Sequence, residues 1–258
     1  MQRARRGEST VDDVFHTKRY DTGMWILLLV LLAPFTPTID LYCSTLFYSS
    51  ETGFYNNFLF YCLYEYGELF GLATGGIASV ILGISFIYPK WKKWRAGAAS
   101  MVLTLVIGAG LVTNMGFKEY WGRPRPKQVI EFGGKHAYRP FWKPDFHTGR
   151  DPQRSFPSGH VSMGFYLISL WMVGKRYQSS LLKNIGLTLT IFLGGGLMIV
   201  RVAQGGHFFS DVIASPILMW YIAKGVDWWI FTSEGWGAQL LGLNTRGISQ
   251  GLDANGRA

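Results

Sequence analysis

Six apolar stretches of bilayer length, or close to it, most restrict how this chain can fold. A helix needs about 20 residues to cross the hydrocarbon core of a bilayer, and only helices or closed barrels satisfy backbone polar groups there. The stretches run roughly Met24–Leu41, Tyr66–Tyr88, Ala96–Phe117, Val161–Val173, Ile185–Val202 and Val212–Phe231. We therefore expect an all-α, polytopic membrane protein, built as a six-transmembrane-helix bundle.

The predicted helices divide the chain into three parts. We expect a cytoplasmic amino-terminal segment at residues 1–23, a six-helix membrane domain at residues 24–233 and a cytoplasmic carboxyl-terminal tail at residues 234–258. Within the membrane domain, residues 118–160 form a long loop. No small-residue cleavage site follows the first apolar stretch, which favours an uncleaved membrane helix over a signal peptide.

Short loops rich in Lys and Arg predict the orientation. The amino-terminal segment holds five Lys/Arg, and further clusters lie in Pro89–Arg95 and in Lys175–Lys183. Six spans place all three on one side, which the positive-inside rule assigns to the cytoplasm. The stretch Lys118–Arg154 lies on the other side and carries nine Lys/Arg against four Asp/Glu, which favours the reverse orientation. We discount it because it is long and because its cations have a chemical explanation.

Composition excludes several classes of protein. Charged residues make up 16% of the chain and hydrophobic residues 48%, which is a low charge content beside soluble domains. The formal net charge of +9 falls in short clusters beside apolar runs, and no nucleic-acid-binding motif is present, so we expect no nucleic-acid partner. Cys43 and Cys62 form no metal or redox motif. Either a disulfide or two free thiols fits them, and free thiols are favoured.

Three polar clusters lie at the ends of the predicted helices, where uncompensated charge is costly. The predicted topology brings all three to the outer face of the membrane. In chain order they are Lys118 followed after six residues by Arg125-Pro126, then Pro157-Ser158-Gly159-His160, then Arg201 followed by His207 and Asp211.

These clusters contain the groups that bind a phosphate. A phosphomonoester carries about −1.5 to −2 charge near neutral pH, and its transfer spreads further charge over oxygens that need converging donors. The N–H groups at a helix start also favour an anion. The predicted phosphate-binding residues are Lys118, Arg125, Ser158, Gly159 and Arg201.

The histidines of these clusters predict how the phosphate is attacked. His207 and Asp211 are four residues apart and share one face if a helix begins there. An Asp bonded to one ring nitrogen fixes the tautomer and leaves the other nitrogen free to attack. His160 is then available to protonate the leaving alkoxide. This chemistry requires no metal and no other cofactor.

The three motifs resemble those of the type 2 phosphatidic acid phosphatase family, which shares a core with the vanadium-dependent haloperoxidases. The resemblance spans about Tyr64–Phe231, and one position departs from it, because Val200 stands where the family usually has Ser. It implies metal-independent hydrolysis of a phosphomonoester through a phosphohistidine on His207. It also implies that His160 is the general acid, that Asp211 orients His207 and that the five residues above bind the phosphate.

The loop Gln128–Arg154 resembles that of bacterial members acting on lipid A, at its 1- or 4′-phosphate. This resemblance implies a phosphorylated lipid substrate and a site on the periplasmic side of the bacterial inner membrane. Four cations in or near the loop are expected to meet a large charged saccharide headgroup, although a loop adhering to anionic lipids fits them as well. They are Arg123, Lys127, Lys135 and Arg139.

Glu65 and Glu68 are acidic residues at the outer end of the second predicted span. Ionisable residues in a span are functional candidates by default. We expect one of them to pair with the surplus cations of the site and hold them in place, with simple interfacial solvation as the alternative.

Other functions fit parts of this pattern. Phosphatidylglycerophosphate, phosphatidic acid and undecaprenyl pyrophosphate are alternative substrates. A transporter that uses His207 and Asp211 as an ion relay is the alternative outside the enzyme class, although it would not require Lys118 and Arg125 on the same side. The apolar spans disfavour a soluble haloperoxidase. The sequence leaves open the lipid, the phosphate position, the phosphate acceptor and the oligomeric state.

Overall fold

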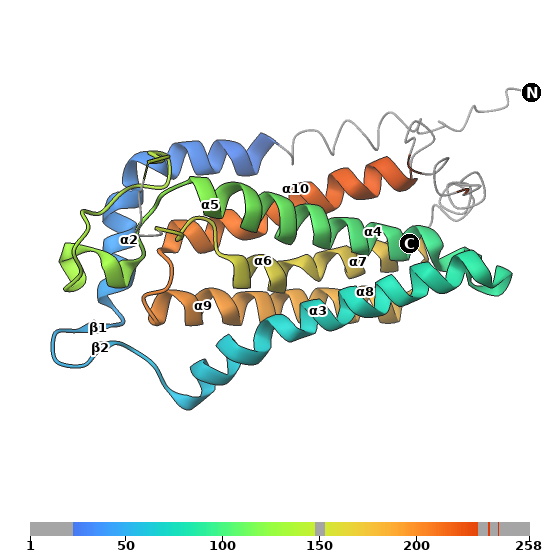
Figure 1. Cartoon of the computed structure of the whole chain (residues 1–258), viewed down its shortest axis with the longest axis horizontal. Coiled ribbons are helices and arrows are strands. Elements are labelled where there is room, and N and C mark those ends of the chain that lie inside the picture. The colour runs from blue at the N-terminus through green and yellow to red at the C-terminus, as the bar shows by residue number, and fades with distance from the viewer. Residues whose placement is uncertain (1–22, 148–152, 232–236, 238–241, 243–258) are drawn as a thin grey trace, which may run out of the picture.

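The computed structural model describes residues 23–147 and 153–231, together with residues 237 and 242. Its helices run back and forth along one long axis (Figure 1). They are α2 (Thr36–Thr45), α3 (Phe58–Ile87), α4 (Arg95–Leu103), α5 (Lys118–Tyr120), α6 (Gly159–Tyr166), α7 (Ile168–Arg176), α8 (Ser180–Leu189), α9 (Gly195–Ala203) and α10 (Phe209–Phe231). Residues 23–32 are also helical and precede a short 3-10 turn at Ala33–Phe35.

Two π-helical stretches join these elements into longer helices. Thr104–Phe117 connects α4 to α5, and Thr190–Gly194 connects α8 to α9. Within the part of the chain that the structure describes, four continuous helices are long and apolar enough to cross a membrane: Gly23–Thr45, Phe58–Ile87, Pro89–Tyr120 and Ser180–Ala203. The prediction of a helical protein with several membrane-length helices is therefore confirmed.

Two of the six predicted spans are not among these four helices. Residues 161–173 fall on α6 and α7, which are separate short helices that meet at Leu167. Residues 212–231 fall on α10, which is long but carries Lys224 and Asp227. The predicted terminal segments 1–23 and 234–258 lie outside the described residues, apart from residues 23, 237 and 242.

Helix α3 begins earlier than the apolar pattern predicts. Its first residue is Phe58 rather than Tyr66, because Asn57 caps the helix by accepting a 2.8 Å hydrogen bond from the backbone N–H of Phe60. The extra turns, residues 58–65, carry mostly aromatic and apolar side chains, with Glu65 as the charged one. Glu65 and Glu68 consequently lie inside the helix and not at its end.

Helix α6 lies at the centre of the bundle and packs against α3, α9, α10 and the π-helical stretch Thr104–Phe117. Small residues allow this close packing, as in many membrane helix pairs. A Cβ on Gly164 would lie 2.7 Å from the Cα of Gly194, and a Cβ on Gly71 would lie 3.0 Å from the carbonyl oxygen of Met163. The start of α6 is thereby held in a fixed place among its neighbours.

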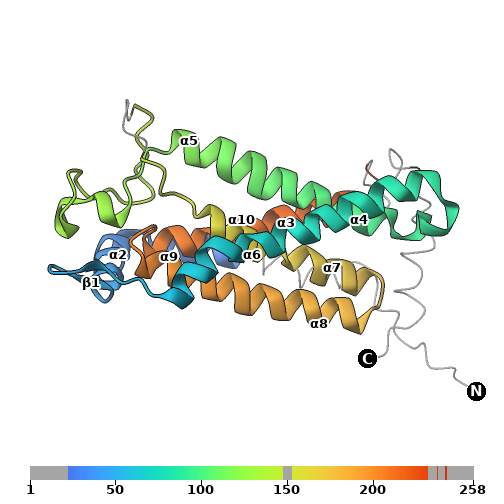
Figure 2. The ribbon, with the colours of Figure 1, turned by 60° about the horizontal axis from the view of Figure 1, so that its bottom comes forward.

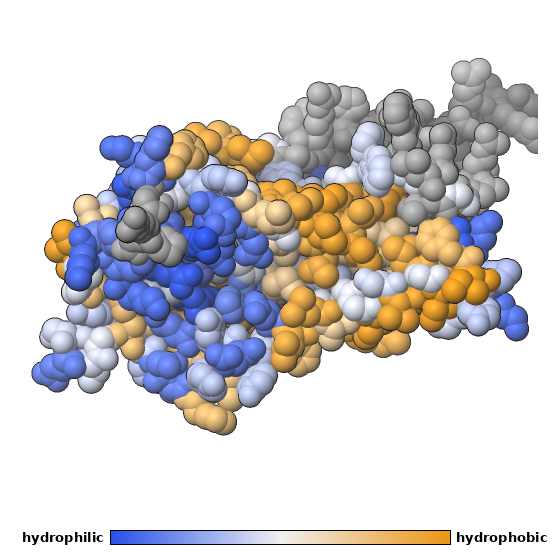
Figure 3. Space-filling model, viewed as in Figure 1, coloured by the Kyte–Doolittle hydropathy of each residue, from blue (hydrophilic) through white to orange (hydrophobic). Residues whose placement is uncertain are grey.

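The loops divide between the two ends of the bundle. The loop between α5 and α6, the β1–β2 hairpin and the turn between α9 and α10 lie at one end (Figures 1 and 2). The 3-10 segment Pro89–Trp94 and the turn between α7 and α8 lie at the other. Polar side chains gather at the first end, and a broad apolar surface covers the middle of the molecule (Figure 3). All three polar clusters therefore meet at one end, away from the basic loops.

A small aromatic cluster supports the hairpin at this end. Strands β1 (Tyr48–Ser49) and β2 (Gly53–Phe54) pair antiparallel, with Tyr48 opposite Phe54. Both rings pack on Phe132, from the 3-10 turn Ile130–Phe132 of the long loop, at centroid distances of 5.1 and 5.3 Å. The hairpin and the loop thus form one wall, from which Phe54 faces the cavity described below.

Cys43 and Cys62 carry free thiols in this structure, as the sequence favours.

Candidate active site

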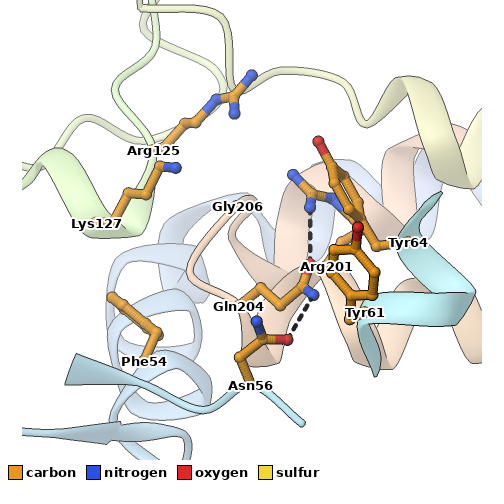
Figure 4. Close-up of a pocket in the computed structure, with 9 residues that line it drawn as sticks. All are labelled: Phe54, Asn56, Tyr61, Tyr64, Arg125, Lys127, Arg201, Gln204 and Gly206. Atoms are coloured by element: carbon orange, nitrogen blue, oxygen red, sulfur yellow. Dashed lines mark hydrogen bonds between the residues drawn. The ribbon is translucent and has the colours of Figure 1, made fainter. Parts of the chain in front are cut away.

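A cavity of about 360 Å³ opens at the polar end, between α3, the long loop and the end of α9 (Figure 4). Three of its lining side chains are cations, and none is a carboxylate. A concave site lined by one sign of charge attracts the opposite charge, so this cavity suits an anion. Its lining residues are Phe54, Asn56, Tyr61, Tyr64, Arg125, Lys127, Arg201, Gln204 and Gly206.

Arg201 lies at the end of α9 and is nearly fully buried. Its guanidinium lies 4.6 Å from the centre of the Tyr64 ring, and its Nη1 donates a 3.0 Å hydrogen bond to Oε1 of Gln204. Its Nε has no hydrogen-bond partner among the described residues. A buried donor without a partner is costly, so this N–H is suited to an anion that enters the cavity.

Gly206 is required for Arg201 to take this position. A Cβ on Gly206 would lie 2.2 Å from Nη2 of Arg201, well inside van der Waals contact. The close approach of the guanidinium to the backbone therefore depends on the missing side chain.

Lys118 lies over the start of α6. A Cβ on Gly159 would lie 3.1 Å from its Nζ. Ser158 caps the helix, since its hydroxyl accepts a hydrogen bond from the N–H of Val161 at 3.5 Å, and its own N–H donates to Oγ of Ser215 at 3.0 Å. The first N–H groups of a helix have no partner within it. A cation and a helix start are thus brought together, an arrangement that favours an anion.

The ring of His160 stacks on Tyr64, with centroids 4.7 Å apart and an interplanar angle of 21°. Its Nε2 lies 3.6 Å from Oε2 of Glu68. The three predicted phosphate-binding cations lie close enough for their charges to act on this ring. Of the two acidic residues singled out on α3, Glu68 thus reaches the site, whereas Glu65 is exposed.

His207 lies in the turn between α9 and α10, and only 1% of its surface is exposed. Its Nδ1 is 2.6 Å from the carbonyl oxygen of Ser155. A carbonyl oxygen can only accept, so Nδ1 carries the proton and Nε2 keeps its lone pair. Burial above all lowers the pKa of His207 to about 3, and the charges of Arg201 and Arg125 act in the same direction. The ring is therefore neutral near pH 7.

Asp211 is beside His207 but does not hold its ring directly. The closest approach, from Oδ2 to Nδ1, is 3.8 Å, which is too long for a hydrogen bond. Oδ2 instead accepts hydrogen bonds from Oγ of Ser155 at 2.6 Å and from the N–H of Phe208 at 2.9 Å. The expected direct contact is thus corrected: the Ser155 carbonyl holds His207, and Asp211 holds Ser155.

The prediction that Arg123 meets a lipid headgroup is wrong. Its side chain is fully buried, with 0% of its surface exposed. All five N–H groups of a guanidinium are used within the protein, because Arg123 donates to Asp40, Asp211, Ser210, Tyr138 and the carbonyl of Arg139. Burial alone would lower the pKa of Arg123, but Asp211 and Asp40 outweigh it and raise that pKa.

The other three loop cations differ in their surroundings. Lys127 lines the cavity, where burial and the neighbouring arginines lower its pKa. Lys135 is exposed on the loop and is not part of the cavity wall. Arg139 donates to the carbonyl of Gly122 at 2.7 Å and pairs with Asp145 at 2.8 Å, so its guanidinium is engaged in holding the loop.

Sequence reasoning missed Asp40 and Ser155. Asp40 lies on α2, is fully buried and pairs with Arg123. Its position at the end of an apolar stretch was a signal, since an acidic residue there is costly without a partner. Ser155 precedes the second cluster and contacts His207 through its backbone carbonyl. Every residue has such a carbonyl, so the sequence gives no sign of this contact. Among the described residues, no group of His, Cys, Asp and Glu is arranged to hold a metal ion.

A model of the PAP2 superfamily matches residues 97–234 of this chain. The lipid A 4'-phosphatase of Francisella tularensis subsp. novicida is 33% identical over 207 residues, which cover 78% of this chain and 88% of that protein. The lipid A 4'-phosphatase of Rhizobium etli is 30% identical over 132 residues, covering 50% of this chain and 47% of that protein. That of Rhizobium leguminosarum is 32% identical over 112 residues, covering 43% and 45%. No solved structure matches the chain.

Proposed function

Because the chain belongs to the PAP2 superfamily, we propose that it is a membrane phosphatase that removes a phosphate from lipid A, with the 4′-phosphate as the favoured position. The observation that carries the activity is a neutral, buried His207 beside a cavity lined by three cations. The substrate is supported by the lipid A 4'-phosphatase that aligns with most of this chain.

In the first step, Nε2 of His207 attacks the phosphorus atom. The N–P bond forms as the bond from phosphorus to the lipid oxygen breaks. His160 gives its proton to the departing oxygen, so that the lipid leaves as an alcohol. The hydrogen bond from Nδ1 to the Ser155 carbonyl keeps the proton off the attacking nitrogen, and it stabilises the positive charge that the ring gains as the new bond forms.

In the second step, water attacks the phosphohistidine. His160, now neutral, accepts a proton from that water, the P–N bond breaks, and inorganic phosphate leaves. His207 and His160 return to their starting protonation states, so the cycle balances without a redox partner. The stacked contact with Tyr64 limits the rotation of the His160 ring during both proton transfers.

The cations hold the phosphate while these steps occur. Arg201 supplies a buried guanidinium whose Nε–H has no hydrogen-bond partner among the described residues. Arg125 lines the same cavity. Lys118 lies beside Gly159 at the start of α6, where Ser158 is the cap, and adds a third cation to the proposed phosphate-binding set. Donors fixed in place before the reaction stabilise the charge that develops on the transferring group.

The rest of the cavity suits a sugar that carries the phosphate. Amide side chains of Asn56 and Gln204 and the rings of Tyr61 and Phe54 line it, and Lys127 adds a further cation. Aromatic faces with a few placed polar groups give a pocket both contact area and orientation. A glycerol phosphate would leave much of this wall unused, which favours a saccharide headgroup over phosphatidic acid.

We further propose that six segments cross the bilayer, with α6–α7 and α10 as the two beyond the four apolar helices. The active site then faces the periplasm from the inner membrane, because the basic loops lie at the opposite end of the bundle. Buried α6 and α10 would be shielded from lipid by their neighbours, which makes a less apolar composition tolerable.

The direct test uses purified full-length protein in detergent with a chelator present. Incubation with lipid A should release inorganic phosphate, and mass spectrometry should show loss of one phosphate at the 4′ position. Phosphatidic acid, phosphatidylglycerophosphate and undecaprenyl pyrophosphate in parallel reactions should be hydrolysed more slowly. Faster hydrolysis of any of these would contradict the substrate, and absence of phosphate release from all four lipids would contradict the activity.

A further inference from the structure

We propose that Asp40, on the amino-terminal apolar helix, is a positioning residue for His207 and acts through Arg123 and Asp211. The inference rests on the proposed phosphatase function. It extends that function to a residue outside the matched family region, since Asp40 precedes residues 97–234.

Asp40 is fully buried, and its carboxylate is held on every side. Oδ1 accepts a 2.7 Å hydrogen bond from the N–H of Ser210. Oδ2 accepts from Nη2 of Arg123 at 2.6 Å, from Oγ of Ser210 at 2.7 Å and from the hydroxyl of Tyr138 at 2.9 Å. These hydrogen bonds hold the Asp40 carboxylate in one orientation, so it can in turn hold Arg123 in place.

Arg123 transmits that position to Asp211. The planar guanidinium presents Nη2 to Asp40 and Nη1 to Oδ1 of Asp211. Because the two nitrogens belong to one rigid group, fixing one end of the fork fixes the other. The plane is further held by the Nε hydrogen bond to the carbonyl of Arg139 at 2.8 Å and by the Phe208 ring at 4.6 Å.

Asp211 then positions Ser155, whose backbone carbonyl holds the ring of His207. Its Oδ1 is used by Arg123, so Oδ2 is left to accept from Oγ of Ser155 and from the N–H of Phe208. The carbonyl of Ser155 accepts from Nδ1 of His207. The series of contacts from Asp40 through Arg123, Asp211 and Ser155 ends on the carbonyl oxygen that fixes the tautomer of His207.

The contacts join parts of the chain that are far apart in sequence. Asp40 is 83 residues from Arg123 and 170 residues from Ser210. The amino-terminal helix therefore does more than anchor the chain in the bilayer. It carries the second of the two carboxylates that pair with Arg123, the residue that also contacts Asp211 beside the reacting histidine.

The test compares Asp40→Asn with Asp227→Asn in the full-length protein. Asp227 pairs with Arg176 at 2.6 Å and joins α10 to α7 far along the bundle, so its loss matches the loss of an ion pair without touching the site. We expect Asp40→Asn to lower kcat on lipid A by about 10- to 100-fold, the scale of a small misplacement of a catalytic group, with KM changed little. Asp227→Asn should keep its kcat.

A second measurement reports on positioning without any turnover. In protein labelled with ¹⁵N-histidine, the substrate-free wild type should show His207 protonated at Nδ1 only, assigned by the loss of its signals in His207→Gln. Asp40→Asn should show a mixture of tautomers, and Asp227→Asn should match the wild type. Tyr138→Phe, which removes one hydroxyl from the network, should shift the mixture in the same direction and serves if Asp40→Asn does not fold.

The outcomes separate the two proposals. An unchanged tautomer and unchanged kcat in Asp40→Asn, or in Tyr138→Phe if it alone folds, would overturn the positioning role. So would an equal fall of kcat in Asp227→Asn, because a general loss of stability would then explain both. If the protein released no phosphate from lipid A but the tautomer still shifted, the proposed function would fail and the positioning role would stand.

Discussion

Nδ1 of His207 lies 2.6 Å from the carbonyl oxygen of Ser155, whereas the nearest carboxylate oxygen of Asp211 is 3.8 Å away. The backbone therefore sets the tautomer of the proposed nucleophile, and the carboxylate acts one contact further back. This arrangement leaves Asp211 free to pair with Arg123 while both oxygens keep partners.

Replacement of Asp211 should harm both stability and catalysis. Asp211→Asn leaves Arg123 buried with Asp40 as its remaining carboxylate partner, so its charge stays balanced, and the loss of stability should be smaller than about 3–5 kcal/mol, the cost of an unpaired buried charge. Thermal unfolding in detergent should show a clear fall in Tm. The value of kcat should fall because the amide offers one acceptor oxygen to Arg123 and Ser155, which the two carboxylate oxygens of Asp211 serve separately. Asp145→Asn, which breaks the more exposed pair with Arg139, is the control. Equal Tm values for the two variants would contradict the buried network.

A methyl group at Gly206 should weaken phosphate binding. The added Cβ would lie 2.2 Å from Nη2 of Arg201 and would displace the guanidinium from the cavity. We expect Gly206→Ala to raise the Kd for inorganic phosphate, measured by calorimetry, by about tenfold, the scale of one charge-assisted hydrogen bond. Gly196→Ala on α9, where a Cβ meets nothing within 4 Å, should bind as the wild type does. Matching affinities in the two variants would contradict this placement of Arg201.

The buried His207 should make stability depend on pH. Its pKa is about 3 in the folded protein and about 6.5 in an unfolded chain. As the pH falls from 6.5 toward 3, the unfolded chain takes up a proton that the folded protein excludes. The free energy of unfolding therefore decreases by about 1.4 kcal/mol per pH unit from this group. The fall in Tm between about pH 7 and pH 5 should be smaller in His207→Gln than in the wild type; equal falls would mean that His207 is not excluded from protonation.

Glu68 should favour the protonated form of His160, since its Oε2 lies 3.6 Å from Nε2. A general acid works only while it carries its proton, so removing the carboxylate should move the basic limb of the kcat profile to lower pH. The shift should be less than about one pH unit, because the side chain of Glu68 is 38% exposed and solvent screens the pair. Glu65→Gln, an exposed residue of the same helix, should leave the profile in place. If both profiles stayed unchanged, Glu68 would not favour the protonated form of His160.

The sequence predicted the convergence of the three clusters correctly, because helices of alternating direction return every second loop to the same end of the bundle. Lys118, His160 and Arg201 are separated widely along the chain, yet their charges act on one another in the folded protein. The start of α6 at Gly159 also follows from the Ser158 cap. Spacing and capping are local or periodic properties, and both can be read along a chain.

Other features depend on contacts that no local pattern encodes. Arg123 and Arg125 are two residues apart in one loop, but the first is fully buried between carboxylates and the second faces the cavity. The positions of Asp40 and Asp211, on two helices far from this loop in sequence, decide between these surroundings. The Ser155 contact with His207 uses a backbone carbonyl, so its side chain gives no indication of it. Helix α3 begins earlier than predicted because the polar residue Asn57 caps it, whereas the prediction used only the apolar stretch.

The central claim is that His207 forms a covalent bond with the phosphate of the lipid. Full-length protein mixed rapidly with lipid A and quenched in alkali, which preserves phosphohistidine, should yield a peptide that carries phosphate on His207, identified by tandem mass spectrometry. His207→Ala should yield no such peptide and release no phosphate. Phosphate release by His207→Ala at the wild-type rate, or a phosphorylated residue other than His207 in the wild type, would contradict the account.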